Sequence, residues 1–310
     1  MRSRRSCLSV PGSSERMLAK APTLPADEVF IDLEDSVAPQ AKEAARANVR
    51  RALEGGDWSG RTVGIRINAV ATPWCYRDLI DVVEPEPGLL DVVIVPKVDG
   101  PADVLFVDRL LTMIEDATGA DARIGIEAQI ETAAGLRAIH AIAHASPRME
   151  ALVFGPADMS ASLGLPATTP GLPMPGYPGD HWHHVLSTIL VAAREAGLDA
   201  VDGPYLRIED LDGFRAAATR ARALGFDGKW ALHPAQIDVL NEVFTPAQEE
   251  FDRAEAIIEA YAHATAVEGR GAVMFGDEMI DEASRKMAAR LAARGRAAGL
   301  VPVRKEESTP

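Results

Sequence analysis

The sequence has few cysteine and few aromatic residues. Of its 310 residues, 2 are cysteine and 5% are Phe, Trp or Tyr. Two cysteines cannot build a disulfide framework, and Cys7 and Cys75 lack the spacing of metal-binding cysteine pairs. Disulfide-rich secreted proteins and zinc modules are therefore excluded, and a reducing, cytoplasmic location is expected.

Long apolar runs and an excess of basic charge are also missing. No stretch of about 18 apolar residues occurs, and the apolar stretch from Cys7 to Val10 is too short for a signal peptide. The 32 basic residues are outnumbered by 46 acidic residues, and the formal net charge is −14. Such a field opposes nucleic acid and anionic membranes as partners, and an anionic substrate would need a local nest of cations.

What the sequence does contain is a regular alternation of short strands and helices. Hydrophobic residues make up 47% and charged residues 25%, which is typical of a globular protein. Between amphipathic helical stretches lie short runs rich in β-branched residues, which we predict to be strands: Cys7 to Val10, Val29 to Leu33, Val63 to Ile67, Val92 to Val95, Ile124 to Ile130, Leu152 to Phe154, Ala200 to Asp202 and Trp230 to Leu232.

Eight strands alternating with helices predict an α/β fold, and eight is the number that closes a TIM (β/α)8 barrel. A doubly wound open sheet is the alternative. We expect the barrel to occupy residues 1–245. Residues 246–310 are predicted to form a C-terminal helical tail or lid, broken at Gly269-Arg270-Gly271.

Polar residues follow nearly every predicted strand, where a barrel keeps its chemistry. Glu131 and Asp158 follow consecutive strands, so they should lie close together. Two neighbouring carboxylates repel unless one is protonated or a cation lies between them, and Mg²⁺ prefers such oxygen ligands. The alternative is that they merely cap helices. Glu127, deeper on the same strand as Glu131, is expected to be a hydrogen-bonded core acid.

Arg66 ends the third predicted strand and favours the metal interpretation. A buried arginine needs an anion, and its planar fork matches a carboxylate at two points. A metal and an arginine together can hold a 2-oxo acid. The alternative is a structural ion pair with Asp32, Glu34 or Asp35.

Six runs, in this order along the chain, resemble the citrate lyase β-subunit and malyl-CoA lyase family. Together with the eighth-strand run they cover residues 6 to 235. They are Ser9-Val10-Pro11-Gly12, Ile31-Asp32-Leu33-Glu34-Asp35-Ser36-Val37, Arg66-Ile67-Asn68, Val95-Pro96-Lys97, Ile130-Glu131-Thr132-Ala133-Ala134-Gly135 and Phe154-Gly155-Pro156-Ala157-Asp158.

The resemblance implies a TIM barrel that binds Mg²⁺ through Glu131 and Asp158, with Mn²⁺ as a substitute. It implies that a 2-oxo acid or its aldol adduct bridges the metal and Arg66, and that Glu34 and Asp35 hold the metal's waters. Substrate contacts from the run Gly155, Pro156 and Ala157 are implied as well.

The tail contains Gly276-Asp277-Glu278-Met279-Ile280-Asp281, which is similar to a segment of malyl-CoA lyases. In those enzymes the aspartate, here Asp281, lies on a mobile tail that reaches a neighbouring subunit and serves as acid/base. This implies a homo-oligomer, a trimer or hexamer, with shared active sites. The alternative is that Asp281 is only a helix N-cap.

The resemblance also implies a coenzyme A thioester as substrate, whose phosphates need cations. Arg16, Lys20, Lys97 and Lys229 are the candidates, although each alone is more often a solvated surface residue.

We therefore expect a lyase that cleaves (S)-malyl-CoA or β-methylmalyl-CoA to glyoxylate and acetyl-CoA or propionyl-CoA. Citramalyl-CoA differs by one methyl group, and a methyl contributes only about 1–3 kcal/mol of discrimination. The same residues would also suit a malyl-CoA thioesterase or malate synthase-type hydrolase. A non-enzymatic interpretation is a scaffold subunit of a larger lyase.

Overall fold

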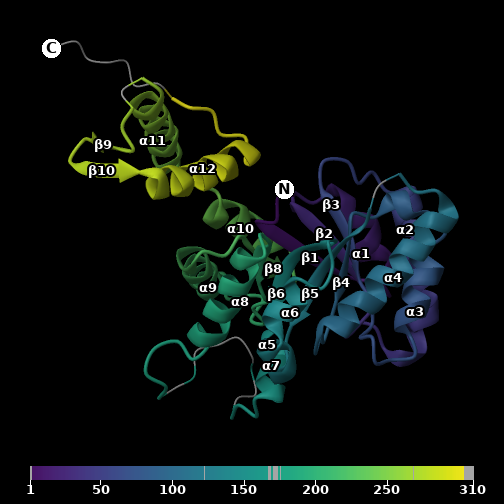
Figure 1. Cartoon of the computed structure of the whole chain (residues 1–310). Coiled ribbons are helices and arrows are strands. Elements are labelled where there is room, and N and C mark those ends of the chain that lie inside the picture. Colours follow the sequence, from purple (N-terminus) through teal and green to yellow (C-terminus); the bar gives the residue numbers. More distant parts are fainter. Residues whose placement is uncertain are drawn as a thin grey trace. The chain divides into compact units, whose positions relative to one another are not determined.

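The computed structural model describes residues 2–121, 123–166, 169, 174, 176–267 and 269–303. The chain forms two compact units, Met1–Phe244 and Thr245–Pro310. Figure 1 labels most of the helices and strands of both units.

The first unit is a closed barrel of parallel strands in the order β1 to β8, in which β8 pairs with β1. Each strand overlaps a predicted run, so the predicted TIM-type barrel is confirmed and the open sheet is excluded. The strands are β1 (Ser6–Pro11), β2 (Glu28–Asp32), β3 (Thr62–Arg66), β4 (Val92–Val95), β5 (Gly125–Ile130), β6 (Met149–Phe154), β7 (Asp199–Asp202) and β8 (Gly228–Ala231).

Helices connect consecutive strands, as right-handed crossovers between parallel strands require. The helical stretch after β5 is interrupted at Ala138 and forms two short helices. The α-helices of this unit are α1 (Glu15–Lys20), α2 (Lys42–Gly55), α3 (Cys75–Asp78), α4 (Pro101–Thr118), α5 (Ala133–Arg137), α6 (Ile139–Ala143), α7 (Pro156–Ser162), α8 (His183–Glu195), α9 (Leu211–Leu224) and α10 (Ile237–Phe244).

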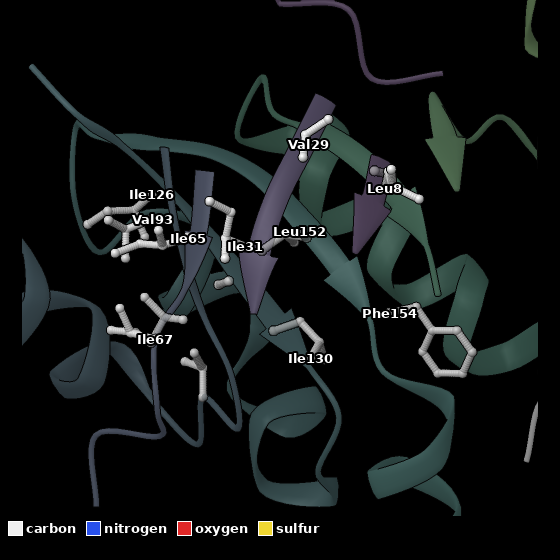
Figure 2. Packing of buried hydrophobic residues seen from close by; sticks show 14 of the residues in the cluster. Leu8, Val29, Ile31, Ile65, Ile67, Val93, Ile126, Ile130, Leu152 and Phe154 are labelled. Carbon is white, nitrogen blue, oxygen red and sulfur yellow. The ribbon is translucent and has the colours of Figure 1, made fainter. Parts of the chain in front are cut away.

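The strands bury both faces, because successive side chains point alternately into the barrel and out toward the helices. The outward residues form the large apolar core, which includes Ile31, Ile65 and Leu152. Figure 2 shows these side chains along their strands. A smaller separate cluster of buried apolar residues, the apolar plug, fills the inside of the barrel. The rings of its Phe30 and Trp230 have centroids 4.4 Å apart.

A charged layer lies below this apolar plug, toward the amino ends of the strands. Nε of Arg4 donates to Oε1 of Glu127 at 2.6 Å, and Nη1 donates to Asp199 at 3.0 Å. Glu28 and Glu127 are fully buried. Glu127 is therefore the hydrogen-bonded core acid that its strand position predicted.

The second unit pairs helices α11 (Gln248–Ala266) and α12 (Glu282–Ala297) around Phe251, Ala254, Ala288 and Ala292. Gly295 lets the helices approach, because a Cβ there would lie 2.2 Å from the Phe251 ring. Along the chain, α11 and α12 are separated by an antiparallel hairpin of β9 (Ala272–Phe275) and β10 (Glu278–Asp281). The sequence did not lead us to expect this hairpin. None of the helices in the described part of the chain could span a membrane.

Candidate active site

Arg66, at the carboxyl end of β3, is held by an aspartate from the neighbouring strand. Nε and Nη2 of Arg66 each donate to a carboxylate oxygen of Asp32 at 2.7 Å. The register explains the pair, because Asp32 lies beside Arg66 where β2 and β3 end. Burial opposes both charges, but the pairing lowers the pKa of Asp32 and raises the pKa of Arg66.

The pair leaves part of the guanidinium unused. Of its five N–H donors, Asp32 accepts from two, on the Nε side. Nη1 lies 3.2 Å from Glu34 and 3.5 Å from the amide oxygen of Gln129. The guanidinium carbon of Arg66 also lies 5.3 Å from the centre of the Trp230 ring. Trp230 belongs to the apolar plug, so Arg66 packs against that cluster. The Nη1–Nη2 edge therefore has donors for a further carboxylate.

Glu131, just after β5, is 2% exposed and is bound from two sides. Oε1 accepts the backbone N–H of Lys97 at 2.8 Å, and Oε2 accepts the side-chain amide of Gln129 at 2.7 Å. Burial and then the negative charge of Asp158 raise the pKa of Glu131 to about 8. A carboxyl group in these surroundings is best satisfied by a proton or a cation.

Gly155 provides the room that Glu131 occupies. A Cβ at position 155 would lie 2.3 Å from Oε2 and 2.4 Å from Cβ of Glu131. Any larger residue at the end of β6 would push the carboxylate out of place. Pro156 begins α7, and Asp158 lies in the first turn of that helix.

The loop after β2 carries Glu34, and hydrogen bonds from buried side chains hold its backbone in place. The ammonium of Lys42 is buried and donates to the backbone oxygens of Leu33 and Glu34, each at 2.8 Å. Asn68 donates to the Leu33 oxygen at 3.0 Å and is itself bound by the buried Asp78. These bonds satisfy the loop's carbonyl groups and hold it at the mouth of the barrel.

Lys97 joins the acidic residues of this mouth. Its ammonium forms an ion pair with Glu34 and lies 3.2 Å from Asp35 and 3.7 Å from Asp158. Burial opposes its charge, but the hydrogen bond and charge of Glu34 raise the pKa of Lys97. The structure therefore brings Glu34, Asp35, Glu131 and Asp158 around one cation.

These carboxylates suit a hard divalent cation. Glu34 is buried, and its Oε2 accepts no hydrogen bond from the described residues. Within the described ranges, no three His, Cys, Asp or Glu side chains converge to enclose a metal by themselves. Mg²⁺ does not need such a cage, because it keeps several waters and uses one or two carboxylates. Glu131 and Asp158 can supply these ligands.

Three other predicted cations lie apart from this cluster or are already paired. Lys229 is 3% exposed, and its ammonium donates to Asp202 and to the Gly203 oxygen, each at 2.6 Å. Its neighbour Trp230 faces into the barrel, so Lys229 faces outward under the helices. In this structure the ammonium of Lys229 is thus already paired, and its contact with coenzyme A stays a prediction. Arg16 and Lys20 are exposed on α1 and remain candidates.

The ammonium of Lys97 is likewise engaged by carboxylates, and its contact with a phosphate of coenzyme A stays a prediction. Ala157 is exposed, whereas Gly155 and Pro156 are buried, so a substrate can reach Ala157 most easily. Asp281 belongs to the second unit and is exposed. Its carboxylate accepts the Ser284 backbone N–H at 3.0 Å, so it does cap α12, and its pKa is lowered by this bond.

Sequence reasoning named Asp32 only as an alternative ion-pair partner of Arg66, and it missed Gln129 as part of the site. Both could have been found from strand alternation, since Asp32 shares a face with Phe30, and Gln129 shares one with Glu131. The same alternation predicts that the side chain of Trp230, which lies against Arg66, faces into the barrel.

Comparison with known proteins agrees with this geometry. Residues 5–234 match the family model described as HpcH/HpaI aldolase/citrate lyase. An L-malyl-CoA/beta-methylmalyl-CoA lyase of Cereibacter sphaeroides is 40% identical over 90% of this chain and 90% of its own length. The citrate lyase subunit beta of Escherichia coli K12 is 36% identical over 90% and 89%.

Solved structures show the same fold. The crystal structure of protein CitE from Mycobacterium tuberculosis, in complex with magnesium, acetoacetate and coenzyme A, matches with a TM-score of 0.72 at 30% identity. It covers 94% of this chain and 97% of its own. A citrate lyase from Burkholderia xenovorans matches with a TM-score of 0.81 over 98% and 94% of the two chains, and at 21% identity it supports the fold alone. The chain belongs to the HpcH/HpaI aldolase/citrate lyase family.

Proposed function

We propose that this protein is a magnesium-dependent lyase that cleaves (S)-malyl-CoA or β-methylmalyl-CoA. The products are glyoxylate and acetyl-CoA or propionyl-CoA. The observation that carries the proposal is the pairing of a carboxylate cluster with Arg66, whose Nη1 lies 3.2 Å from Glu34 of that cluster. The 40% identity to an L-malyl-CoA/beta-methylmalyl-CoA lyase supports this choice of substrate.

Glu131 and Asp158 would hold the magnesium ion, with Glu34 and Asp35 binding its waters. When bound, Mg²⁺ would polarise the oxygen on the carbon that becomes a carbonyl. Mn²⁺ should substitute, because it accepts similar oxygen ligands. Arg66 would bind the carboxylate of glyoxylate through its Nη1–Nη2 edge while Asp32 keeps the guanidinium from rotating.

The reaction breaks the bond between Cα and Cβ of a β-hydroxyacyl thioester. The β-hydroxyl would give up its proton to the Asp281 carboxylate, the carbon that bears the hydroxyl leaves as the aldehyde of glyoxylate, and the bond electrons remain on Cα as an acyl-CoA enolate. Asp281 would return a proton to Cα. In the condensation direction the same carboxylate would remove that proton, and its lowered pKa keeps it ionised for this task.

Coenzyme A would bind at the barrel mouth with its phosphates near Arg16 and Lys20 of α1. Both side chains are exposed and no other described group pairs with them in the structure, so they can meet an anion at little cost. We further propose a cytoplasmic homo-oligomer, a trimer or hexamer, in which the tail of a neighbouring subunit supplies Asp281.

One assay tests this proposal. Purified protein is incubated with malyl-CoA, β-methylmalyl-CoA and citramalyl-CoA, with Mg²⁺ or with excess EDTA, while glyoxylate, pyruvate and free thiol are followed. We expect glyoxylate without free thiol from the first two substrates, and no product in EDTA.

Different outcomes would point to different activities. Pyruvate from citramalyl-CoA at a higher rate would indicate a citramalyl-CoA lyase. Free thiol would indicate a hydrolase, and full activity in EDTA would contradict the metal role. No turnover at all with the isolated chain would favour a subunit of a larger lyase, as the 36% identity to citrate lyase subunit beta allows.

A further inference from the structure

Lys97 has an unusual backbone conformation at the centre of the carboxylate cluster. Among the described residues it is the one non-glycine residue with positive φ, at 51°. This left-handed conformation is unfavourable for a side chain with a Cβ, and such residues concentrate at functional sites. Here it lets one residue act at two points, because the backbone N–H binds Glu131 while the side chain turns toward Glu34.

The ammonium of Lys97 supplies the main positive charge of the cluster. Glu34, Asp35 and Asp158 all lie within 4 Å of Nζ, and the charge of Glu131 also acts on it. Arg66 acts on Glu34 as well, with Nη1 at 3.2 Å, but Asp32 already accepts two of its hydrogen bonds. Without Lys97, four carboxylates would face one another with little compensation.

The position of the ammonium conflicts with that of a bound cation. A metal ion that touches Asp158 and Glu131 must lie within a few ångströms of Nζ, which is 3.7 Å from Asp158. Two cations at such a distance repel strongly in a partly buried site. The lysine side chain has a flexible stem, and that of Lys97 is 29% exposed, so the ammonium can swing outward while the backbone stays in place.

We propose that Lys97 is the resident counter-ion of the carboxylate cluster, and that a divalent cation binds by displacing its ammonium. Lys97 thereby stabilises the metal-free protein and lowers the affinity for the metal. Because this metal is the Mg²⁺ of the proposed function, the role of Lys97 rests on that proposal. Lys97 is a positioning residue, since it acts through Glu34, Glu131 and Asp158.

The experiment measures metal binding without substrate. Lys97→Met keeps the length and removes the charge. Mn²⁺ binding is measured by electron paramagnetic resonance and Mg²⁺ binding by calorimetry. We expect Lys97→Met to bind both ions more tightly, on the order of tenfold, because the competing charge is gone. Its metal-free form should melt earlier than wild type, and Mg²⁺ should raise its melting temperature by more.

Two further variants separate competition from general damage. Lys97→Arg retains the charge, so its metal affinity should equal or fall below that of wild type. Lys286→Met removes an exposed lysine of α12 and should change neither metal affinity nor melting. Lys97→Gln, also neutral, replaces Lys97→Met if the latter does not fold.

Each result decides the matter. Equal or weaker metal binding by both neutral Lys97 variants would overturn the proposal and make Lys97 a support for the ligands. Binding by Lys97→Met with none by wild type would support it in its strongest form. If neither wild type nor a neutral variant binds a divalent cation, the proposed function itself fails. If wild type binds and the neutral variants do not bind more tightly, only the role of Lys97 fails.

Discussion

Arg66 shows how one residue can be both structural and functional. Its bidentate bond to Asp32 is a structural ion pair, yet it uses only one edge of the guanidinium. The pair keeps the charged group rigid, so little rotamer entropy is lost when a carboxylate binds the other edge. The two interpretations of Arg66 that the sequence left open are therefore compatible.

We predict that Arg66→Lys weakens glyoxylate binding in the condensation direction. Lysine keeps the charge but has no planar edge, so charge-assisted hydrogen bonds of about 1.5–3 kcal/mol are lost. The KM for glyoxylate should rise roughly 10- to 100-fold, while the KM for acetyl-CoA changes little. Steady-state kinetics with each substrate varied in turn checks this. An unchanged KM for glyoxylate would leave Arg66 only its bond to Asp32.

We predict that Gly155→Ala disables the metal site without unfolding the barrel. The added Cβ would lie 2.3 Å from Oε2 of Glu131 and 2.4 Å from its Cβ, so the glutamate must move. Overpacking of this kind costs about 1–3 kcal/mol. Calorimetry should show at least about tenfold weaker Mg²⁺ binding, from the loss of one charged ligand contact.

The control for this prediction is Gly88→Ala, where a Cβ would meet nothing within 4 Å. It should bind Mg²⁺ like wild type. Normal Mg²⁺ binding by Gly155→Ala would show that Glu131 is not a ligand.

Strand alternation decides which of these residues the sequence could reveal. Glu131, Arg66 and Asp158 stand at strand ends and can be found from that position alone. The partner of Lys229 follows from side-chain direction: the neighbouring Trp230 points inward, so Lys229 points outward to Asp202. The position of the Lys97 ammonium could not be predicted, because it depends on a left-handed backbone that lysine rarely adopts.

At the scale of elements, the hairpin places Asp281 between a strand and a helix. Asp281 ends β10 and caps α12, and its carboxylate is exposed. The hairpin could have been predicted from its two-residue turn, because Gly276-Asp277 between two short strand-like runs is a typical hairpin signal. Gly276 has φ of 63°, which such a turn requires. The Gly269-Arg270-Gly271 break by itself indicates only that the helical tail is interrupted.

We predict that Asp281→Asn folds normally but loses nearly all turnover. Asparagine caps helices about as well as aspartate, so the contribution of about 0.5–2 kcal/mol is kept. An amide cannot carry the proton, and general acid–base catalysis contributes about 10²–10⁴-fold. Thermal melting and Mg²⁺ calorimetry should match wild type while the rate of malyl-CoA cleavage falls by that factor.

Asp281→Ala is the matched comparison, since it loses both the cap and the carboxylate and should melt earlier. Wild-type rates in Asp281→Asn would leave Asp281 only its role as a cap. If the tail acts on a neighbouring subunit, mixing Asp281→Asn with Arg66→Ala protein should restore part of the activity, because some sites then combine an intact tail with an intact barrel.

At the scale of the whole molecule, the barrel interior has three layers along its axis. Inward residues of β2 are Glu28, Phe30 and Asp32, and those of β5 are Glu127 and Gln129, with Glu131 just after the strand. Polar groups at the carboxyl end form the candidate active site, and Phe30 lies in the apolar plug. The alternation predicts that these side chains face inward. It does not predict which acid meets which base, because that depends on strand stagger around the closed barrel.

The charged layer toward the amino ends of the strands contains more acidic than basic side chains. Arg4 lies 3.3 Å from Glu28, but no described group donates a hydrogen bond to either oxygen of this glutamate. Burial, and then the nearby charge of Glu127, raise the pKa of Glu28 well above its ordinary value of 4.5. Glu28 is therefore protonated in the folded protein at pH values where the unfolded chain has already lost the proton.

The raised pKa of Glu28 predicts how the stability of the protein depends on pH. A carboxyl group with a raised folded-state pKa contributes stability below its unfolded pKa, and that contribution is lost as pH rises toward the folded value. Glu28→Gln has the shape of the protonated acid and cannot ionise, so its stability contribution is not lost as pH rises. Its free energy of unfolding relative to wild type should increase from pH 5 to pH 8, by at most about 1.4 kcal/mol per pH unit. Urea unfolding at several pH values measures this, with the exposed Glu84→Gln as a control that should show no such trend. If Glu28→Gln instead becomes less stable than wild type as pH rises, Glu28 is ionised in the folded barrel and serves as a required partner of Arg4.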